Sequence, residues 1–181
     1  MKTLGYGNRI GIWTIGCSHH CHNCSNPELW NSNPSKDISI DNIVKCIEKI
    51  KDADGITITG GDPFEQPKEL LSLVLRLKEL KYEDILVYSG YTYKQLTSKG
   101  ESYQTILDNI GVLIDGLYID ELNDNKSIRG SSNQCIYVLN EKLEDRYEDV
   151  CNWERQSQIL LSNNEIQVIG LPMKNNERNV L

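Results

Sequence analysis

The sequence lacks a hydrophobic run long enough to cross a bilayer, and its N-terminus lacks an apolar stretch with a small-residue cleavage site. We therefore expect a cytoplasmic protein with no membrane partner. The sequence also lacks a basic stripe, because its 19 Lys and Arg residues are scattered among 26 Asp and Glu residues and the net charge is -7. A nucleic-acid partner is not expected, since phosphate backbones are bound by clustered positive charge.

Metal-binding side chains are scarce, and they are concentrated in one segment, residues 16–24. This segment holds three of the six cysteines and all three histidines. Its cysteines, Cys17, Cys21 and Cys24, are four and three residues apart, and no second Cys-x2-Cys pair elsewhere could complete a four-thiolate zinc site. Three thiolates suit a four-iron, four-sulfur cluster in which one iron keeps an open position for a substrate.

Residues 16–24 by themselves leave two other interpretations open. Zinc could be bound by the three cysteines and one histidine, His19, His20 or His22, because three-Cys, one-His sites are common. Disulfide pairing is suggested by the even number of cysteines and disfavoured by a reducing compartment. The remaining cysteines are isolated, and we expect structural roles for Cys46, Cys135 and Cys151. Cys46 is expected to be a small buried residue.

Short β-branched runs alternate with amphipathic stretches, which predicts an α/β fold with a mostly parallel sheet. A chain of 181 residues is most simply one domain and is too short for a complete eight-unit barrel. The predicted parallel strands are 10–15, 55–59, 85–88 and 112–114. Helices are predicted over 40–50 (capped by Ser39 or Asp41), over 67–80, from Thr92, and over 103–110. Edge strands are predicted at 136–139 and 166–169, with a charged helical segment between 141 and 155.

The second predicted strand runs directly into Gly60-Gly61-Asp62-Pro63 and then a helix. Ligands of parallel α/β sheets bind at the carboxyl ends of the strands. Two adjacent glycines let the backbone approach a ligand closely, although such a pair is usually only a turn. Ser89 and Asp115 also follow predicted strands. Asp115 precedes a glycine, so that it is either a turn-forming residue or a polar ligand contact.

Two of these motifs resemble those of radical S-adenosylmethionine (SAM) enzymes: the Cys-x3-Cys-x2-Cys loop after an apolar strand, and the Gly-Gly-Glu/Asp-Pro turn. Further phrases occur in the order seen in the activating proteins of anaerobic ribonucleoside-triphosphate reductase, a family of glycyl-radical enzyme activases. The phrases are GCSHHCHNC, ITITGGDPFEQP, VYSGYTYKQL, LIDGLYIDEL and RGSSNQ. The resemblance covers about residues 16–134, and the last phrase is the one specific to this group.

The resemblance implies a partial (β/α) barrel of the radical SAM type, with helices on the outside, in a single domain over 1–181. The core would be about 10–134 and a C-terminal extension 135–181. The implied cofactors are a [4Fe-4S] cluster and SAM. The implied reaction is reductive cleavage of SAM to a 5'-deoxyadenosyl radical and generation of a glycyl radical on the large subunit of anaerobic ribonucleotide reductase. Flavodoxin or a similar protein would donate the electron, and no catalytic acid or base is required.

Site residues follow from the resemblance position by position. The implied cluster ligands are Cys17, Cys21 and Cys24. The residues implied at the adenine end of SAM are Asn23, Cys24 and Ser25. Those implied at its methionine ammonium are Gly60, Gly61 and Asp62. Weaker candidates near its ribose or carboxylate are Ser89 and Asp115. A partner-facing loop is implied at 129–134.

Two departures from the family pattern keep alternatives open. Ser25 follows the third cysteine, where the family commonly has an aromatic residue, and the tail beyond Gln134 is longer than that of a minimal activase. Both would fit a radical SAM enzyme that modifies a peptide or a small molecule. A zinc-stabilised binding module is a further alternative, but it leaves the Gly60-Gly61-Asp62-Pro63 turn unexplained.

Overall fold

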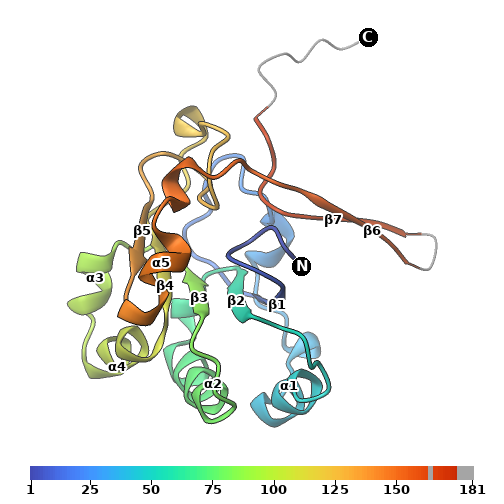
Figure 1. Cartoon of the computed structure of the whole chain (residues 1–181), viewed down its shortest axis with the longest axis vertical. Coiled ribbons are helices and arrows are strands. Elements are labelled where there is room, and N and C mark those ends of the chain that lie inside the picture. The colour runs from blue at the N-terminus through green and yellow to red at the C-terminus, as the bar shows by residue number, and fades with distance from the viewer. Residues whose placement is uncertain (163–164, 175–181) are drawn as a thin grey trace.

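Four short parallel strands and one antiparallel strand form the central sheet in the computed structural model, which describes residues 1–162 and 165–174 (Figure 1). The strands lie in the order β1-β2-β3-β4-β5, with β5 antiparallel to β4. Their bounds are β1 Arg9–Thr14, β2 Gly55–Gly60, β3 Ile85–Tyr88, β4 Val112–Asp115 and β5 Cys135–Val138. The α/β class and the mostly parallel sheet predicted from the sequence are confirmed.

The register of the sheet aligns the carboxyl ends of its parallel strands. In β1 and β2, Arg9 pairs with Gly55 and Thr14 with Gly60, so the two strands end together. In β3 and β4, Tyr88 pairs with Ile114, and the Ser89 N–H donates to the Ile114 carbonyl at 2.9 Å. The segments that follow the strands therefore begin side by side at one edge of the sheet.

Helices connect the strands, and two of these helices begin at a side-chain cap. The Ser39 hydroxyl accepts a hydrogen bond from the Asn42 N–H, and Thr92 forms a reciprocal capping box with Gln95. Both helix starts were predicted. The α-helices are α1 Ile40–Ile47, α2 Pro67–Glu79, α3 Tyr93–Thr97, α4 Glu101–Asn109 and α5 Glu144–Tyr147.

The sheet has a separate apolar core on each face, because successive strand residues point to opposite sides. On one face, Ile56, Ile58 and Val87 pack against α1, α2 and α4, which lie next to one another in Figure 1. On the other face, Leu86, Val112 and Ile114 pack against residues from the C-terminal extension. These covering residues are Leu143, Tyr147 and Val150.

Three sequence predictions need correction. α1 ends at Ile47 rather than residue 50, and Cys46 is exposed rather than buried, because the helix buries the stripe that contains Val44 and Ile47. The predicted helical region 141–155 is only α5 flanked by 3-10 turns. The strand predicted at 166–169 is β7 (Glu165–Ile169). It pairs with β6 (Gln158–Ser162) in a separate two-stranded sheet, because neighbouring segments of the chain pair locally, and it is not an edge of the main sheet.

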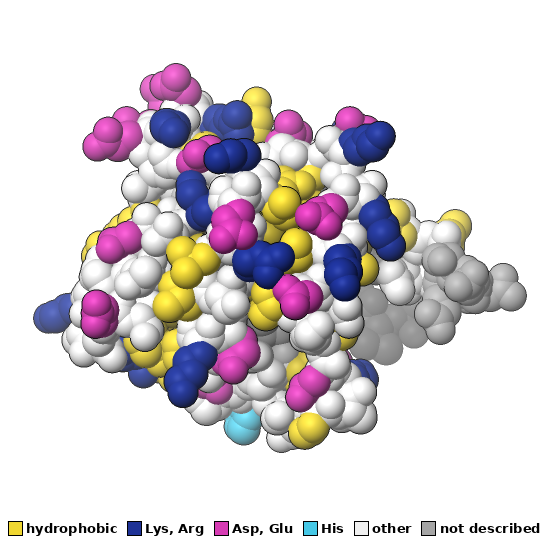
Figure 2. Space-filling view, turned by 90° about the horizontal axis from the view of Figure 1, so that it is seen from below, with side chains coloured by type: hydrophobic (Ala, Val, Ile, Leu, Met, Phe, Trp, Pro, Cys, Tyr) yellow, Lys and Arg dark blue, Asp and Glu magenta, His cyan; other side chains and the backbone are white. Residues whose placement is uncertain are grey.

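Charges of both signs are mixed on the surface shown in Figure 2, where Lys and Arg side chains lie among Asp and Glu side chains. No helix within the described residues is long and apolar enough to cross a membrane.

Candidate functional site

A cavity of about 140 Å³ lies at the carboxyl ends of the parallel strands. It is lined by the segment after β1, the turn after β2, the end of β3 and the loop before β5. The structure brings most of the predicted site residues to this cavity: Cys17, Cys21, Cys24, Ser25, Gly60, Gly61, Asp62 and Ser89.

The cysteine loop is anchored at its base and along its length. The Gly16 and Cys17 N–H groups donate to the carbonyls of Leu29 and Trp30 at 2.8 and 2.9 Å. Within the loop the Cys24 N–H donates to the Cys21 carbonyl at 3.1 Å. The backbone and hydroxyl of Ser18 both donate to a Glu65 carboxylate oxygen in the 3-10 turn Pro63–Glu65. The loop therefore lies directly over the turn that follows β2.

The two glycines after β2 are required by the approach of the chain to β1. A Cβ at Gly61 would lie 2.2 Å from the Gly16 carbonyl oxygen, and a Cβ at Gly60 would lie 2.6 Å from the Thr14 backbone. Gly60 also has a φ of 104°, which an L-residue rarely adopts. The Gly61 and Asp62 N–H groups donate to the carbonyls of Thr14 and Gly16, each at 2.8 Å. The glycine pair thus joins the cysteine loop to the second strand.

Asp62 is almost fully buried and organises the centre of the cavity wall. Its Oδ1 accepts from the Phe64 N–H at 2.9 Å, and the Ser89 hydroxyl lies 3.1 Å from both carboxylate oxygens. Its Oδ2 accepts from the Gly90 N–H at 2.9 Å and from His19 Nε2 at 2.8 Å. The hydrogen bond from His19 raises the pKa of that histidine. One carboxylate therefore ties the cysteine loop to the ends of β2 and β3.

The donor chemistry of the cavity fits a cluster held by thiolates. Burial raises the pKa of the Cys17 and Cys21 thiols, so that a bound cation is needed to keep them as thiolates at neutral pH. The Asn26 N–H lies 3.4 Å from Cys24 Sγ, which suits a hydrogen bond to a ligand sulfur. Trp30 also lines the cavity, and its buried indole N–H has no hydrogen-bond acceptor among the described residues.

Two predicted residues do not line the cavity. Asn23 is exposed, with a φ of 55°, and its amide donates to Asp120 Oδ2 at 3.1 Å. Asp115 is buried, and its carboxylate accepts from the Tyr93 N–H at 2.5 Å and from the Cys135 N–H at 3.1 Å. Asp115 thus caps α3 and fixes the start of β5.

The histidines of the loop have separate environments. His19 contacts Asp62, His20 packs on Trp30 with ring centroids 4.7 Å apart, and His22 is exposed. Among the described residues, no three His, Cys, Asp or Glu side chains are close enough to bind a single metal ion. This geometry adds no support to the zinc interpretation.

Sequence reasoning missed several residues of the cavity wall, because they come from distant segments. Tyr118 precedes a 3-10 turn, and Leu171 lies in the C-terminal extension. His19 was considered only as a zinc ligand, although it lies two residues after the first cysteine and contacts the turn after β2. Other lining residues that were not predicted are Asn26, Trp30, Thr59, Tyr88, Gly90 and Gly116.

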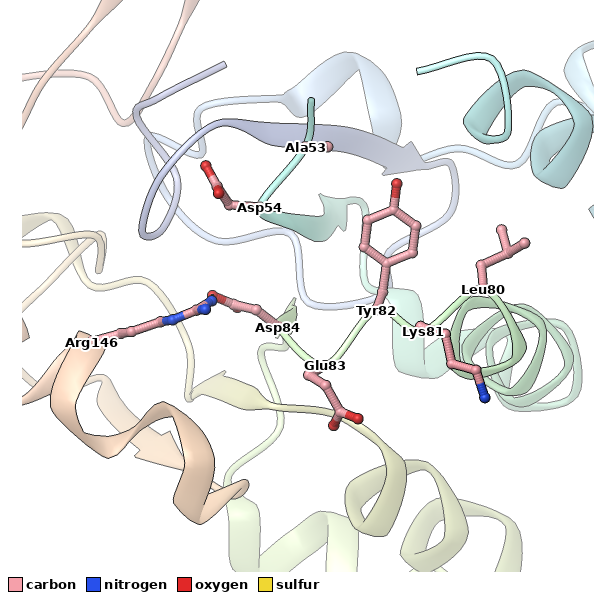
Figure 3. Close-up of a pocket in the computed structure, with 8 residues that line it drawn as sticks. All are labelled: Ala53, Asp54, Leu80, Lys81, Tyr82, Glu83, Asp84 and Arg146. Atoms are coloured by element: carbon pink, nitrogen blue, oxygen red, sulfur yellow. The ribbon is translucent and has the colours of Figure 1, made fainter. Parts of the chain in front are cut away.

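A second cavity, of about 380 Å³, lies at the opposite end of the strands, where β2 and β3 begin (Figure 3). Its side chains include Arg146, which points toward Asp84 in the figure. Asp84 is fully buried, 3.0 Å from an Arg9 guanidinium nitrogen, and accepts a hydrogen bond from Tyr147 at 3.0 Å. Arg9 also donates to the Ile56 carbonyl at 2.7 Å. These contacts join the N-terminal segment to the sheet and to α5, and we assign this end a structural role.

Comparison with known proteins agrees with the cavity chemistry. Residues 3–137 match the family described as a 4Fe-4S single cluster domain. The chain is thus an α/β protein of the class that holds one four-iron, four-sulfur cluster. It is 33% identical over 143 residues to the anaerobic ribonucleoside-triphosphate reductase-activating protein of Salmonella typhimurium, over 75% of this chain and 91% of the relative. The chain belongs to the family of anaerobic ribonucleoside-triphosphate reductase-activating proteins.

Other relatives agree. The Vibrio cholerae protein of the same name is 34% identical over 141 residues, which are 74% of this chain and 89% of the relative. The pyruvate formate-lyase-activating enzyme of Staphylococcus aureus is 29% identical over 154 residues, which are 81% of this chain and 61% of that enzyme. No solved structure matches the chain. The family and the cluster predicted from the motifs are confirmed, and a zinc-stabilised binding module is not supported.

Proposed function

We propose that this chain is a radical SAM activase that generates a glycyl radical on anaerobic ribonucleoside-triphosphate reductase. The main support is that the three cysteines of a 4Fe-4S family member share one cavity with the Gly60-Gly61-Asp62 turn. When bound, the cluster supplies the electron that cleaves SAM, and the resulting 5'-deoxyadenosyl radical removes a hydrogen atom from a glycine of the reductase.

In this proposal Cys17, Cys21 and Cys24 hold the cluster, leaving one iron for SAM. The Gly60 and Gly61 backbone and Asp62 hold the methionine end of SAM. Further contacts near the cofactor are proposed as follows: Asn23, Cys24 and Ser25 beside adenine, and Ser89 beside the ribose or carboxylate. Asp115 is assigned a positioning role instead, because both of its carboxylate oxygens already bind backbone N–H groups.

In this proposal the cysteine loop moves outward when SAM binds. The cavity volume of about 140 Å³ is below the roughly 300–1,000 Å³ of typical small-molecule sites. Asp62 already accepts hydrogen bonds from four protein groups, which occupy the acceptor sites of a carboxylate. Of these donors, only His19 belongs to the cysteine loop. Outward movement of the loop would enlarge the cavity and would free, for the ammonium group of SAM, the acceptor position on Asp62 Oδ2 that His19 occupies.

The same proposal covers features that the family implies beyond the observed α/β sheet. The sheet would be the partial (β/α) barrel of radical SAM enzymes, in one domain with a C-terminal extension. The protein would be cytoplasmic and would receive its electron from flavodoxin or a similar protein. The mixed surface charge in Figure 2 gives no support to a nucleic-acid partner.

The test is anaerobic reconstitution followed by incubation with SAM and a reductant. We expect iron and sulfide in the protein, 5'-deoxyadenosine as a product, and a glycyl radical signal when the reductase is added. Cys21→Ala should lose the cluster and both products, because two thiolates under-ligate it. Cys46→Ala is the matched control, since Cys46 is exposed and does not line the cavity.

A protein that holds no iron and sulfide after reconstitution would refute the proposal, as would full activity of Cys21→Ala. Formation of 5'-deoxyadenosine without any radical on the reductase would instead favour the alternative enzyme, one that modifies a peptide or a small molecule.

A further inference from the structure

The hairpin of β6 and β7 presents an exposed aliphatic face. Cross-strand partners point to the same side of an antiparallel pair, as do residues two apart in one strand. The pairs Ile159–Val168 and Leu161–Ile166 therefore share one face. The exposed fractions of these side chains are 66% for Ile159, 64% for Val168, 79% for Leu161 and 70% for Ile166. We call these four residues the aliphatic face. Figure 1 shows the hairpin projecting from the body of the molecule.

The base of the hairpin is firmly anchored on both sides. Just before β6, the guanidinium of Arg155 is buried and donates to the carbonyls of Pro172 at 2.9 Å and Arg129 at 2.5 Å. It also donates to the side-chain oxygen of Asn123 at 2.8 Å. Five residues after β7, the Lys174 ammonium donates to the Asp120 carbonyl at 2.7 Å. The hairpin therefore projects from a fixed position.

That position is the rim of the cysteine cavity. Leu171, two residues after β7, lines the cavity together with the three cysteines. Asp120, whose carbonyl binds Lys174, accepts a hydrogen bond from Asn23 of the cysteine loop through its side chain. The aliphatic face is thus attached through short, hydrogen-bonded segments to the residues that surround the site.

The hairpin is also separate from the part of the chain shared by the family. The family match covers residues 3–137, and the hairpin begins at Gln158. The aliphatic face packs on nothing in the sheet cores, whose members come from other segments. Four exposed aliphatic side chains on a two-stranded sheet lack a fold-stabilising function and are typical of an interaction surface.

We propose that the aliphatic face docks on an apolar surface of the glycyl-radical enzyme, next to the glycine delivered to the cavity. The inference rests on the proposed function, which requires that enzyme to lie against the rim where Leu171 is found. A second copy of this chain is a poorer occupant. Even four side chains from each of two copies fall short of the roughly 1,200 Å² that a stable interface buries in total, whereas they can extend an interface already formed at the cavity.

A pair of double variants tests the docking. The face variant, Leu161→Thr with Ile166→Thr, changes one cross-strand pair of the aliphatic face. The control, Leu160→Thr with Gln167→Thr, changes the adjacent cross-strand pair on the opposite face. Threonine keeps the strand preference in both.

Two measurements are made on each reconstituted protein. The first is the reductase concentration that gives half-maximal glycyl radical formation, and the second is 5'-deoxyadenosine formation without the reductase. The face variant should raise the first by at least about tenfold, because burial of one aliphatic side chain corresponds to a factor of that size. The second should stay unchanged. The control variant should match the unaltered protein within about twofold in both.

Direct binding to the purified reductase, measured by fluorescence anisotropy without SAM, separates failure of the docking from failure of the proposed function. Weaker binding of the face variant alone supports the docking even if no radical is formed. Equal binding of all three proteins overturns it. Loss of 5'-deoxyadenosine formation in a face variant that retains its iron also overturns it, because the face would then serve this chain's own site. A third outcome also overturns the docking: the unaltered protein is a dimer, the face variant is a monomer, and both bind the reductase equally well.

Discussion

Substitution of Gly61 by alanine tests whether the glycine pair is needed to join the two motifs. The added Cβ would lie 2.2 Å from the Gly16 carbonyl oxygen, a backbone atom that moves only with the base of the cysteine loop. Gly61 does not have a positive φ, so the effect is steric rather than conformational. Relief of the overlap would break the hydrogen bonds from the Gly61 and Asp62 N–H groups to the carbonyls of Thr14 and Gly16, each 2.8 Å long.

The expected cost follows from these two terms. Overpacking costs about 1–3 kcal/mol, and each lost hydrogen bond about 0.5–1.5 kcal/mol, so we expect Gly61→Ala to lower the free energy of unfolding by about 2–6 kcal/mol. Because the cysteine loop is displaced, we also expect less iron and sulfide per chain after reconstitution. Urea denaturation followed by circular dichroism measures the first quantity, and iron and sulfide analysis measures the second.

Gly100→Ala is the matched control. Gly100 has a φ of 115° and no atom within 4 Å of the position that a Cβ would take, so alanine there adds backbone strain of about 1–3 kcal/mol without a collision. Its cluster content should equal that of the unaltered protein. If Gly61→Ala reconstitutes as fully as Gly100→Ala and is as stable as the unaltered protein, the steric reasoning is wrong.

Two further predictions concern buried and exposed carboxylates. Asp84→Ala should lower the free energy of unfolding by about 3–5 kcal/mol, because it leaves the buried Arg9 guanidinium without its carboxylate. Asp41→Ala removes one partner of an exposed ion pair and should cost less than about 1 kcal/mol in the same denaturation assay. Equal costs for the two variants would contradict the structural role assigned to Asp84. Tyr118→Phe should raise the pKa of Asp120, since the hydroxyl 2.6 Å from its carboxylate is the largest cause of its lowered pKa. The folded state favours the ionised form, so the linked stability is present above the ordinary Asp range and is lost as the pH falls through the folded pKa. An unchanged carboxyl titration by NMR would contradict this.

Much of the fold was predictable because its signals are local. The β-branched runs, the capping residues Ser39 and Thr92, and the glycine turn after β2 act over a few residues, and each has the predicted structure. The hairpin was half predicted, since 166–169 has the pattern of a strand but nothing in that pattern identifies its partner. Cys46 was misplaced because it lies beside the stripe of α1 that contains Val44 and Ile47, and that flank of the helix is exposed.

The sequence by itself determined the cysteine spacing, the strand–turn–helix units and the family, because these depend on residues close together in the chain. Only the tertiary structure decided which side chains meet. In the structure, His19 is hydrogen-bonded to Asp62, Asp115 accepts hydrogen bonds from backbone N–H groups, and Leu171 lines the cavity. Such contacts depend on strand order and register, which bring together segments that are far apart in the sequence. No local preference of the chain encodes that order or register.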